Sequence, residues 1–440
     1  MLAEPSSPGD TSKADERNLR AGIPMGRSGD STPLTIDSPE ARLLFAAVAA
    51  ARDGKSFEAV LDHLRAPIRW DAFMDAAGRH RVRPLVHAAL RQAPASLVPA
   101  TANAQLRGFV HANAHRNLYL ISELRRLLGC FLSAGISVTA FKGPVLATDL
   151  YRNPSLREAG DLDLLVRRAD IVRARNLLIS LGHQPIFPTA TPAETAHLQK
   201  LTGDRETAYV QAHSEHHLVR EQGQLNIDLH WALAVSDFYL PLDEKRLWSW
   251  IAPRSFIGRE IQTFAPEALL LVLCINGGKD CWERLDRICD VAALLARYPT
   301  LDWEYVFAQA SAIGVLRIVA LGLHLAVSLL AGALGPPARK LIESDPSIPR
   351  LAAQVREHLF APESSAVEAA SPRRSLFHVQ MRERISDRIG YCLGHLKPGV
   401  GDWAALPLPG GLHFLYYLTR PLRLATRYTE TALRSRIARH

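Results

Sequence analysis

The chain has 440 residues, of which 48% are hydrophobic, and its 52 basic and 44 acidic residues give a formal net charge of +8. A chain of this length forms about two or three domains with a sizeable core, and its composition is that of an ordinary globular protein. The modest basic excess is compatible with phosphate-bearing or membrane partners but identifies neither. The five cysteines are scattered and form no CxxC pair, which indicates reduced thiols in the cytoplasm.

The first segment differs in composition from the rest of the chain. Residues 1–37 are rich in Ser, Pro, Gly, Asp and Arg and contain no apolar run, so we expect a disordered tail and no secretory signal. Ser38 can cap a helix and Pro39 can take the first helical position, which predicts that order begins here. An N-terminal helical region is then expected over residues 38–134.

Residues 136–160 predict a strand that leads through a glycine turn into a short helix. Residues 136–141 are β-branched and strand-like, and Lys142-Gly143-Pro144 follows directly. Proline suits a first helical position. A strand, a glycine turn and a helix N-terminus commonly hold an anion, and Lys142 adds positive charge at this point.

Asp161 and Asp163 are the most informative pair of residues in the chain. They lie one residue apart in an apolar run, GDLDLLV, and side chains alternate along a strand, so both would point the same way. Carboxylates this close repel each other, and Mg²⁺ would relieve the repulsion because it binds carboxylate oxygens together with substrate phosphates. The alternative is an edge strand on which both carboxylates face solvent.

A second group of polar residues lies in a predicted hairpin over residues 216–231. Its arms, HHLV and QLNIDLHW, flank a Glu-Gln-Gly turn, and Asp228 lies between two apolar residues of the second arm. His230 would share the face of Asp228, where it would orient a carboxylate, contact substrate or serve as a structural histidine. His216 and His217 are neighbours in a strand and would point to opposite faces, which argues against a zinc site.

The region after the core is expected to be helical over residues 251–360. Its most apolar stretch, 318–335, approaches the length of a membrane span, but Arg317 and His324 favour a buried helix instead. Residues 361–411 are polar or rich in Gly and Pro, which predicts a linker and an irregular segment.

The last segment, 412–440, predicts a basic amphipathic tail. It contains six arginines and a single acidic residue, Glu430, interleaved with aromatic residues and leucines. Two interpretations stay open: a helix docked on the protein with a solvated basic face, or attachment to an anionic membrane surface. Nucleic acid is an unlikely partner. We therefore expect a cytoplasmic protein, with peripheral attachment to membranes as the second option.

The combined pattern resembles the polymerase β-like nucleotidyltransferase superfamily, and within it the bacterial family of uncharacterised nucleotidyltransferases. Members of this family carry a Lys-Gly turn, an arginine shortly before GDxDLLV, a helix ending in LG(H/Y), and an (E/D)LHW strand. The matching positions here are Lys142, Gly143, Arg157, Asp161, Asp163, Asp228, His230 and Trp231. The resemblance covers roughly residues 40–335. Where the family often has HGAKH, this chain has NGGKD at 276–280, without a histidine.

The resemblance implies a fold and an activity. The fold is α+β, with a small mixed-sheet nucleotidyltransferase core over residues 135–250 flanked by N- and C-terminal α-helical regions. The activity is Mg²⁺-dependent transfer of a nucleoside monophosphate from a nucleoside triphosphate to an unidentified acceptor hydroxyl. The alternative is a non-catalytic nucleotide-binding or scaffold protein of the same fold.

The resemblance also implies roles for the matching residues. The three acids would be catalytic and would hold one or two Mg²⁺ ions: Asp161, Asp163 and Asp228. The nucleotide would be bound by Lys142, Gly143 and Arg157, although Arg157 can also simply pair with a carboxylate. His230 would not bind the metal directly but would orient one of the carboxylates by a hydrogen bond.

Overall fold

The computed structural model describes residues 34–53, 57–186, 210, 213–220, 225–234, 238–361, 372–395 and 415–416. The expected tail over residues 1–37 lies outside the described residues except for 34–37, and the expected amphipathic tail over 412–440 lies outside them except for 415–416.

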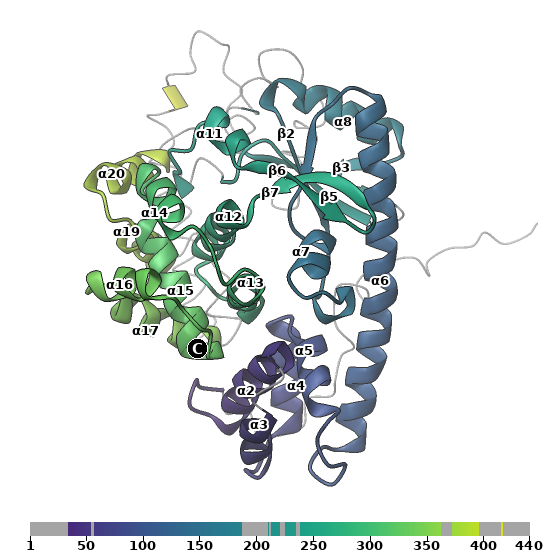
Figure 1. Ribbon diagram of the computed structural model, residues 1–440, viewed down its shortest axis with the longest axis vertical. Helices are drawn as coiled ribbons and strands as arrows, with labels where there is room; N and C mark the ends of the chain where they lie inside the picture. The colour runs from purple at the N-terminus through teal and green to yellow at the C-terminus, as the bar shows by residue number, and fades with distance from the viewer. Residues whose placement is uncertain are drawn as a thin grey trace, which may run out of the picture.

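The N-terminal region is helical, as predicted. Its helices are α2 (Pro39–Asp53), α3 (Phe57–Leu64), α4 (Trp70–Arg79), α5 (Arg83–Leu90) and α6 (Ala100–Ser133). At 1.5 Å per residue, the 34 residues of α6 span about 50 Å, and this helix runs from the N-terminal helices to the sheet (Figure 1). Leu120, Leu124, Leu127 and Phe131 recur at helical spacing and are buried against the sheet.

A five-stranded mixed sheet forms the centre of the expected core. Its strands are β1 (Val138–Ala140), β2 (Leu162–Val166), β3 (Gln184–Ile186), β4 (Glu215–Arg220) and β5 (Leu225–His230), in the spatial order β1-β2-β5-β4-β3. β2 and β5 are parallel, and the other neighbouring pairs are antiparallel. The β4–β5 pair is the hairpin predicted from the sequence. The helices α7 (Pro144–Asp149), α8 (Ile171–Ser180) and α11 (Glu244–Ser249) belong to the same region.

The two faces of the sheet differ in chemistry. Leu162 and Leu164 of β2, with Ile227 and Leu229 of β5, pack into the apolar layer that contains α6. The residues between them point to the other side because side chains alternate along a strand. The alternation of apolar and acidic residues in the sequence therefore gives one apolar face and one polar face, and the polar face is turned towards the C-terminal helices.

The region after the sheet contains mostly helices. They are α12 (Pro266–Lys279), α13 (Leu285–Arg297), α14 (Trp303–Ala312), α15 (Leu316–Leu330), α16 (Pro336–Ser344) and α17 (Ile348–Leu359). The apolar stretch expected to be a buried helix is α15, whose residues Val319, Leu321 and Leu323 are buried among the other helices. Among the described residues, no helix is long and apolar enough to cross a membrane.

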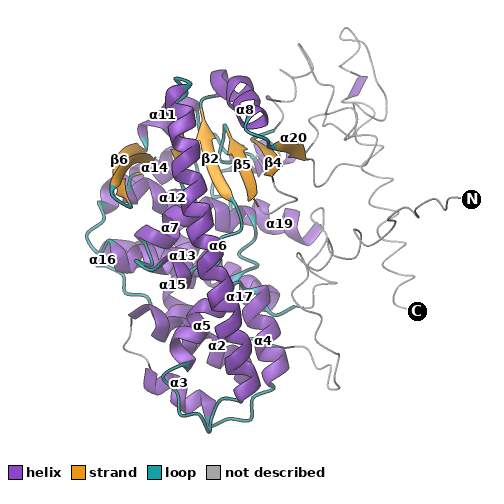
Figure 2. Cartoon of the chain, turned by 90° about the vertical axis from the view of Figure 1, so that its right-hand side faces the viewer, coloured by secondary structure: helices purple, strands orange, loops and turns teal. Residues whose placement is uncertain are grey.

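The N-terminal and C-terminal helices share one hydrophobic core. The same buried cluster contains residues of α2 and α5 as well as residues of α12, α13 and α15. Arg79 of α4 donates to the carbonyl oxygens of Leu359 and Ala361, both at 2.8 Å. The two flanking regions are thus packed together beneath the sheet, and α6 lies alongside both the sheet and the N-terminal helices (Figure 2).

Two segments differ from the sequence-based expectation. The region expected to be helical from residue 251 begins with a hairpin, β6 (Ile251–Phe256) and β7 (Arg259–Phe264). The linker expected over 361–411 contains two helices, α19 (Pro372–Gln380) and α20 (Ile385–Gly394). Phe377 and Met381 enter the large helical core, and this burial stabilises a segment whose polar composition favours a linker.

Candidate active site

The strands β2 and β5 bring two of the predicted acids together. Asp163 and Asp228 are register partners on these adjacent parallel strands. Ligand atoms of Asp163, Asp228 and His230 all lie within 4.8 Å of one another. Asp163 and His230 are buried, at 5% and 4% exposure, whereas Asp228 is partly exposed at the mouth of the group. The strand pairing thus places the carboxylates of Asp163 and Asp228 on the same face of the sheet.

Asp161 lies immediately before β2 and lines the same cavity as the other two acids. Burial raises the pKa of the Asp161 carboxyl, and the negative charges of Asp163 and Asp228 raise it further. Both effects disfavour the ionised form of Asp161 in the protein alone. A bound cation would reverse this, because it offsets the repulsion among the three carboxylates.

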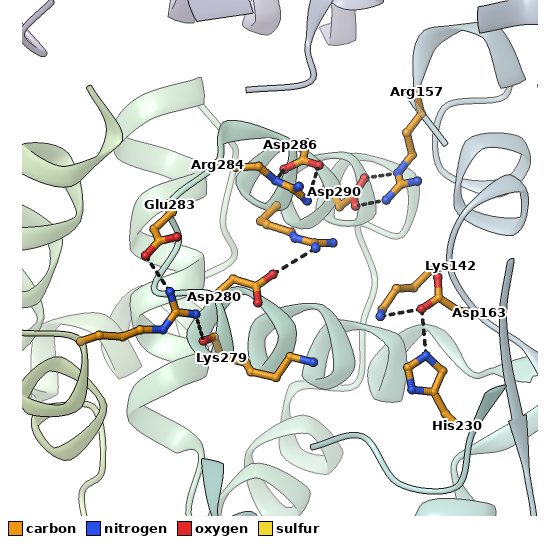
Figure 3. A network of polar contacts seen from close by, with 12 residues as sticks. Lys142, Arg157, Asp163, His230, Lys279, Asp280, Glu283, Arg284, Asp286 and Asp290 are labelled. Carbon is orange, nitrogen blue, oxygen red and sulfur yellow. Dashed lines mark hydrogen bonds and ion pairs between the residues drawn. The ribbon is translucent and has the colours of Figure 1, made fainter. Parts of the chain in front are cut away.

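Asp163 is neutralised by two cationic side chains. The Nζ atom of Lys142 lies 2.8 Å from Oδ1 of Asp163, and Nε2 of His230 lies 3.1 Å from the same oxygen (Figure 3). Burial raises the pKa of Asp163, but Lys142 and His230 outweigh it and hold that pKa far below its usual range. The carboxylate is therefore ionised throughout the neutral range.

His230 joins Asp163 to a further acid, Glu215 of β4. Its Nδ1 atom lies 2.9 Å from Oε2 of Glu215, so each ring nitrogen faces a carboxylate oxygen. Burial lowers the pKa of His230, but the hydrogen bonds to Asp163 and Glu215 outweigh burial and raise it to about 9. With a carboxylate oxygen at each ring nitrogen, His230 is placed to orient Asp163 and Glu215.

The two histidines before Asp228 separate as the strand alternation predicts. His217 lies on the polar face, where its Nδ1 atom is 2.7 Å from Oδ1 of Asp228. His216 lies on the opposite face, with its ring 5.0 Å from that of the buried Trp231. Only one of the two histidines reaches the site.

The turn before α7 requires glycine. Gly143 has a φ of 50°, and a Cβ atom added there would lie 2.6 Å from the backbone oxygen of Asp161. The close approach of the two backbones is what places Lys142 beside Asp163. The predicted proline stands at the start of α7, a helix of only six residues.

Arg157 lines the cavity and pairs with a carboxylate. Its Nε and Nη2 atoms each lie 2.9 Å from a carboxylate oxygen of Asp290 on α13, and Tyr151 donates to the same carboxylate at 2.9 Å. The side chain of Arg157 is 8% exposed, and Nη1 lies 3.4 Å from the carbonyl oxygen of Gly143. Arg157 thus ties the glycine turn to the helical body.

A basic wall faces the acids across a cavity of about 140 Å³. We use this name for Arg81, Lys279, Arg284 and Arg287, which line the cavity from the segment between α4 and α5 and from the region of α12 and α13. Two of these residues also pair with acids, Arg287 with Asp280 at 3.0 Å and Arg284 with Asp286 at 3.1 Å. Among the described residues, no ion pair is found for Lys279 or Arg81.

The chain matches the model of the uncharacterised nucleotidyltransferase family over residues 66–331. It belongs to this family. No curated protein and no solved structure shows a significant match to the chain.

Every residue that lines the cavity lies within the part of the chain matched by the family. Two features of the site were not predicted from the sequence, the basic wall and Glu215. Glu215 had a usable signal, because it lies two residues before His217 and so shares its strand face. For the basic wall, the sequence drew attention to the segment 276–280, which contains Lys279, but it did not indicate that this residue and the three arginines would meet, because they come from segments far apart in the chain.

Proposed function

We propose that this protein is a Mg²⁺-dependent nucleotidyltransferase that moves a nucleoside monophosphate from a nucleoside triphosphate to an acceptor hydroxyl. The observation that carries the proposal is the pairing of Asp163 with Asp228 across β2 and β5, opposite a wall of cationic side chains. Acids that gather on one side of a cavity favour divalent cations, and bases on the other side favour phosphate oxygens.

The residues present fit magnesium. Asp161, Asp163 and Asp228 offer oxygen ligands, which Mg²⁺ prefers, and the pKa of Asp161 is raised by burial and by the charges of the other two acids. Lys142 and His230 both contact Oδ1 of Asp163, and among the described residues no contact to Oδ2 is found. When bound, Mg²⁺ would neutralise phosphate charge and lower the pKa of a coordinated hydroxyl.

The side chains of the site would bind the phosphates and accept the proton of the acceptor. Lys142 and the basic wall would hold the β- and γ-phosphates, and their charges would stabilise the departing pyrophosphate. Asp228, whose side chain is 23% exposed, would accept the proton of the acceptor hydroxyl, with His217 fixing its orientation at 2.7 Å. The acceptor oxygen then forms a bond to the α-phosphorus while the bond from that phosphorus to the bridging oxygen of pyrophosphate breaks.

The proposal is tested by incubating the purified protein and Mg²⁺ with each of the four α-³²P-labelled nucleoside triphosphates and a cell extract. We expect one or more labelled products, loss of labelling with EDTA, and loss of labelling in Asp228→Asn. Lys245→Ala, an exposed position on α11, is the matched surface control and should label normally. Labelling that persists in Asp228→Asn would contradict the assignment of this acid.

The second candidate is a non-catalytic nucleotide-binding or scaffold protein. The ion pair between Lys142 and Asp163 favours it, because a lysine at 2.8 Å already neutralises a carboxylate that a catalytic metal would need. Under this alternative, Mg²⁺-dependent binding of a nucleoside triphosphate is expected without any labelled product or release of pyrophosphate. Equilibrium binding measured beside the labelling reaction separates the two functions.

A further inference from the structure

Lys279, the last residue of α12, belongs to the basic wall. Its ammonium group extends into the cavity (Figure 3), and among the described residues no ion pair holds it. The charge of Lys279 also reaches the acids on the sheet, since it contributes to lowering the pKa of Glu215 on β4. The direction of this side chain depends on how the chain leaves α12.

The chain leaves α12 through a strained turn. Cys281 and Trp282 have φ values of 52° and 56°, a left-handed conformation that is uncommon for residues other than glycine. Such backbone persists only where its surroundings force it. On one side the turn is fixed by Trp282, which is fully buried so close to Gly277 that a Cβ atom there would lie 2.4 Å from its ring.

On the other side the turn is held by α19. Arg374 donates from Nη2 to the carbonyl oxygen of Lys279 at 2.9 Å, and its Nη1 atom lies 2.8 Å from Oε1 of Glu283. The Nε2 atom of His378 lies 3.2 Å from the same carbonyl oxygen and must donate, because a carbonyl can only accept. Tyr391 then donates to Nδ1 of His378 at 3.1 Å. Burial lowers the pKa of His378 to about 3, so the ring stays neutral with one proton.

These contacts cap the C-terminal end of α12. The last carbonyl groups of a helix have no partner within it, and cationic side chains commonly bind them. Here two donors from one helix converge on the carbonyl of a residue that lines the cavity. α19 lies beyond residues 66–331, the part of the chain matched by the family.

We propose that α19 is a positioning element of the nucleotide site, in which Arg374 and His378 fix the backbone of Lys279 so that its ammonium group binds the β- and γ-phosphates of the donor. This inference rests on the proposed function, since it assumes that the cavity takes a nucleoside triphosphate. Lys279 touches the substrate, whereas Arg374 and His378 act through it.

The test is titration calorimetry of the full chain with Mg²⁺-tripolyphosphate, and with each Mg²⁺-nucleoside triphosphate, for four variants beside the wild type. Lys279→Met should weaken binding about tenfold, as expected for a lost charge-assisted contact. Arg374→Gln should weaken it about fivefold, and Arg374→Lys, which keeps a charged donor, should weaken it less. Arg373→Gln removes the same charge from an exposed neighbouring position and should leave the affinity unchanged.

A double-mutant cycle separates positioning from a merely structural role. If Arg374 acts through Lys279, the pair Lys279→Met with Arg374→Gln should bind no more weakly than Lys279→Met alone. The inference would be overturned if the losses of affinity in the two single variants multiply in the double variant. It would also be overturned if Arg374→Gln lowers the Tm but leaves the Kd unchanged. Either result would leave the proposed function standing. If Arg374→Gln does not fold, the cycle is run with Arg374→Lys and read the same way. Absence of any Mg²⁺-dependent binding by the wild type would overturn both.

Discussion

Two cations contact the same oxygen of Asp163, whereas no ion pair is found for Asp161 among the described residues. This difference separates two acids that the sequence presents as equivalent. Asp163 is an ionised carboxylate with buried partners, and Asp161 is an acid whose pKa is raised by burial and by its neighbours. Their substitution should therefore have opposite effects on the stability of the metal-free protein.

For Asp163→Asn we expect loss of transfer activity and a fall of about 3 kcal/mol in the free energy of unfolding, because Lys142 loses its buried partner. For Asp161→Asn we expect loss of activity but a rise in that free energy, because at neutral pH the charge removed is one that burial and like charges disfavour. Urea unfolding at pH 7 in EDTA measures both. A fall in stability for Asp161→Asn would show that its carboxylate has a stabilising partner.

Lys142→Ala should chiefly weaken the binding of a nucleoside triphosphate. A lost charge-assisted contact is worth about 1.5–3 kcal/mol, which corresponds to a Kd at least tenfold higher. Because Lys142 also neutralises Asp163, the same variant should bind Mg²⁺ more tightly in the absence of nucleotide. Calorimetric titrations with Mg²⁺ and with a Mg²⁺-nucleotide check the two shifts. An unchanged nucleotide Kd would leave Lys142 as a structural ion-pair residue.

At the scale of the elements, the glycine turn between β1 and α7 sets the distance between Lys142 and the acids. Gly143→Ala forces a side chain into a left-handed position and against the backbone of Asp161, at 2.6 Å. We expect a loss of at least 2 kcal/mol, on the order of one strained residue plus overpacking, together with reduced nucleotide binding. Gly108→Ala is the control, because that glycine lies in α6 with open space around it and alanine favours helix. Chemical denaturation of both variants measures the difference.

The first turn of α2 offers a test by pH. Glu40 is 2% exposed and accepts from the backbone nitrogen of Arg69 at 2.9 Å and from its Nε at 3.1 Å. Burial raises the pKa of Glu40, but the hydrogen bonds from Arg69 outweigh it, so the folded-state pKa lies below the usual value of 4.5. A lowered pKa stabilises the fold above the unfolded pKa, and that contribution is lost as the pH falls through the folded value.

Glu40→Gln should therefore be less stable than the wild type at pH 7, and the gap should narrow below about pH 4.5, the unfolded-state value. Urea unfolding at a series of pH values between 7 and 3 follows the gap. The exposed Glu58→Gln on α3 is the control and should show a small, flat difference. If the difference in the free energy of unfolding between wild type and Glu40→Gln does not change with pH, the loss of stability is due to packing and not to the charge of Glu40.

At the scale of the whole molecule, the cavity lies where the polar face of the sheet meets a helical body made from both ends of the described chain. Asp163 and Asp228 come from the sheet, and the basic wall comes from the helical body on the other side of the cavity. Relative movement of the sheet and this body would change the width of the cavity. The ion pair of Arg157 with Asp290 joins the two across 133 positions of the chain.

The basic segment 412–440 leads to a prediction for the molecule as a whole. Its six arginines and interleaved aromatic residues predict attachment to anionic membrane surfaces, at about 1 kcal/mol per basic residue. Removing residues 412–440 should abolish co-sedimentation with phosphatidylserine vesicles and leave nucleotide binding unchanged. Neutral phosphatidylcholine vesicles are the control. If the shortened protein instead loses thermal stability and the full chain binds no vesicles at low salt, the tail is a docked structural element.

The sequence alone determined the features that depend on neighbours in the chain. Alternation around Asp163 and Asp228 predicted two strands with acids on one face, and Lys142-Gly143-Pro144 predicted the turn that feeds α7. These signals are local, because strand alternation and turn chemistry are fixed by residues a few positions apart. The family and the α+β fold were indicated by the resemblance of these motifs to a known family.

Only the tertiary structure decided which distant residues meet. It paired Arg157 with Asp290, brought Lys279 and Arg287 to face the acids, and placed α19 against the end of α12. These contacts join segments that no local periodicity relates, and they follow from how the helices bury their apolar faces in a common core. The sequence therefore specifies the acids of the site, and the packing of the helices specifies the charges that surround them.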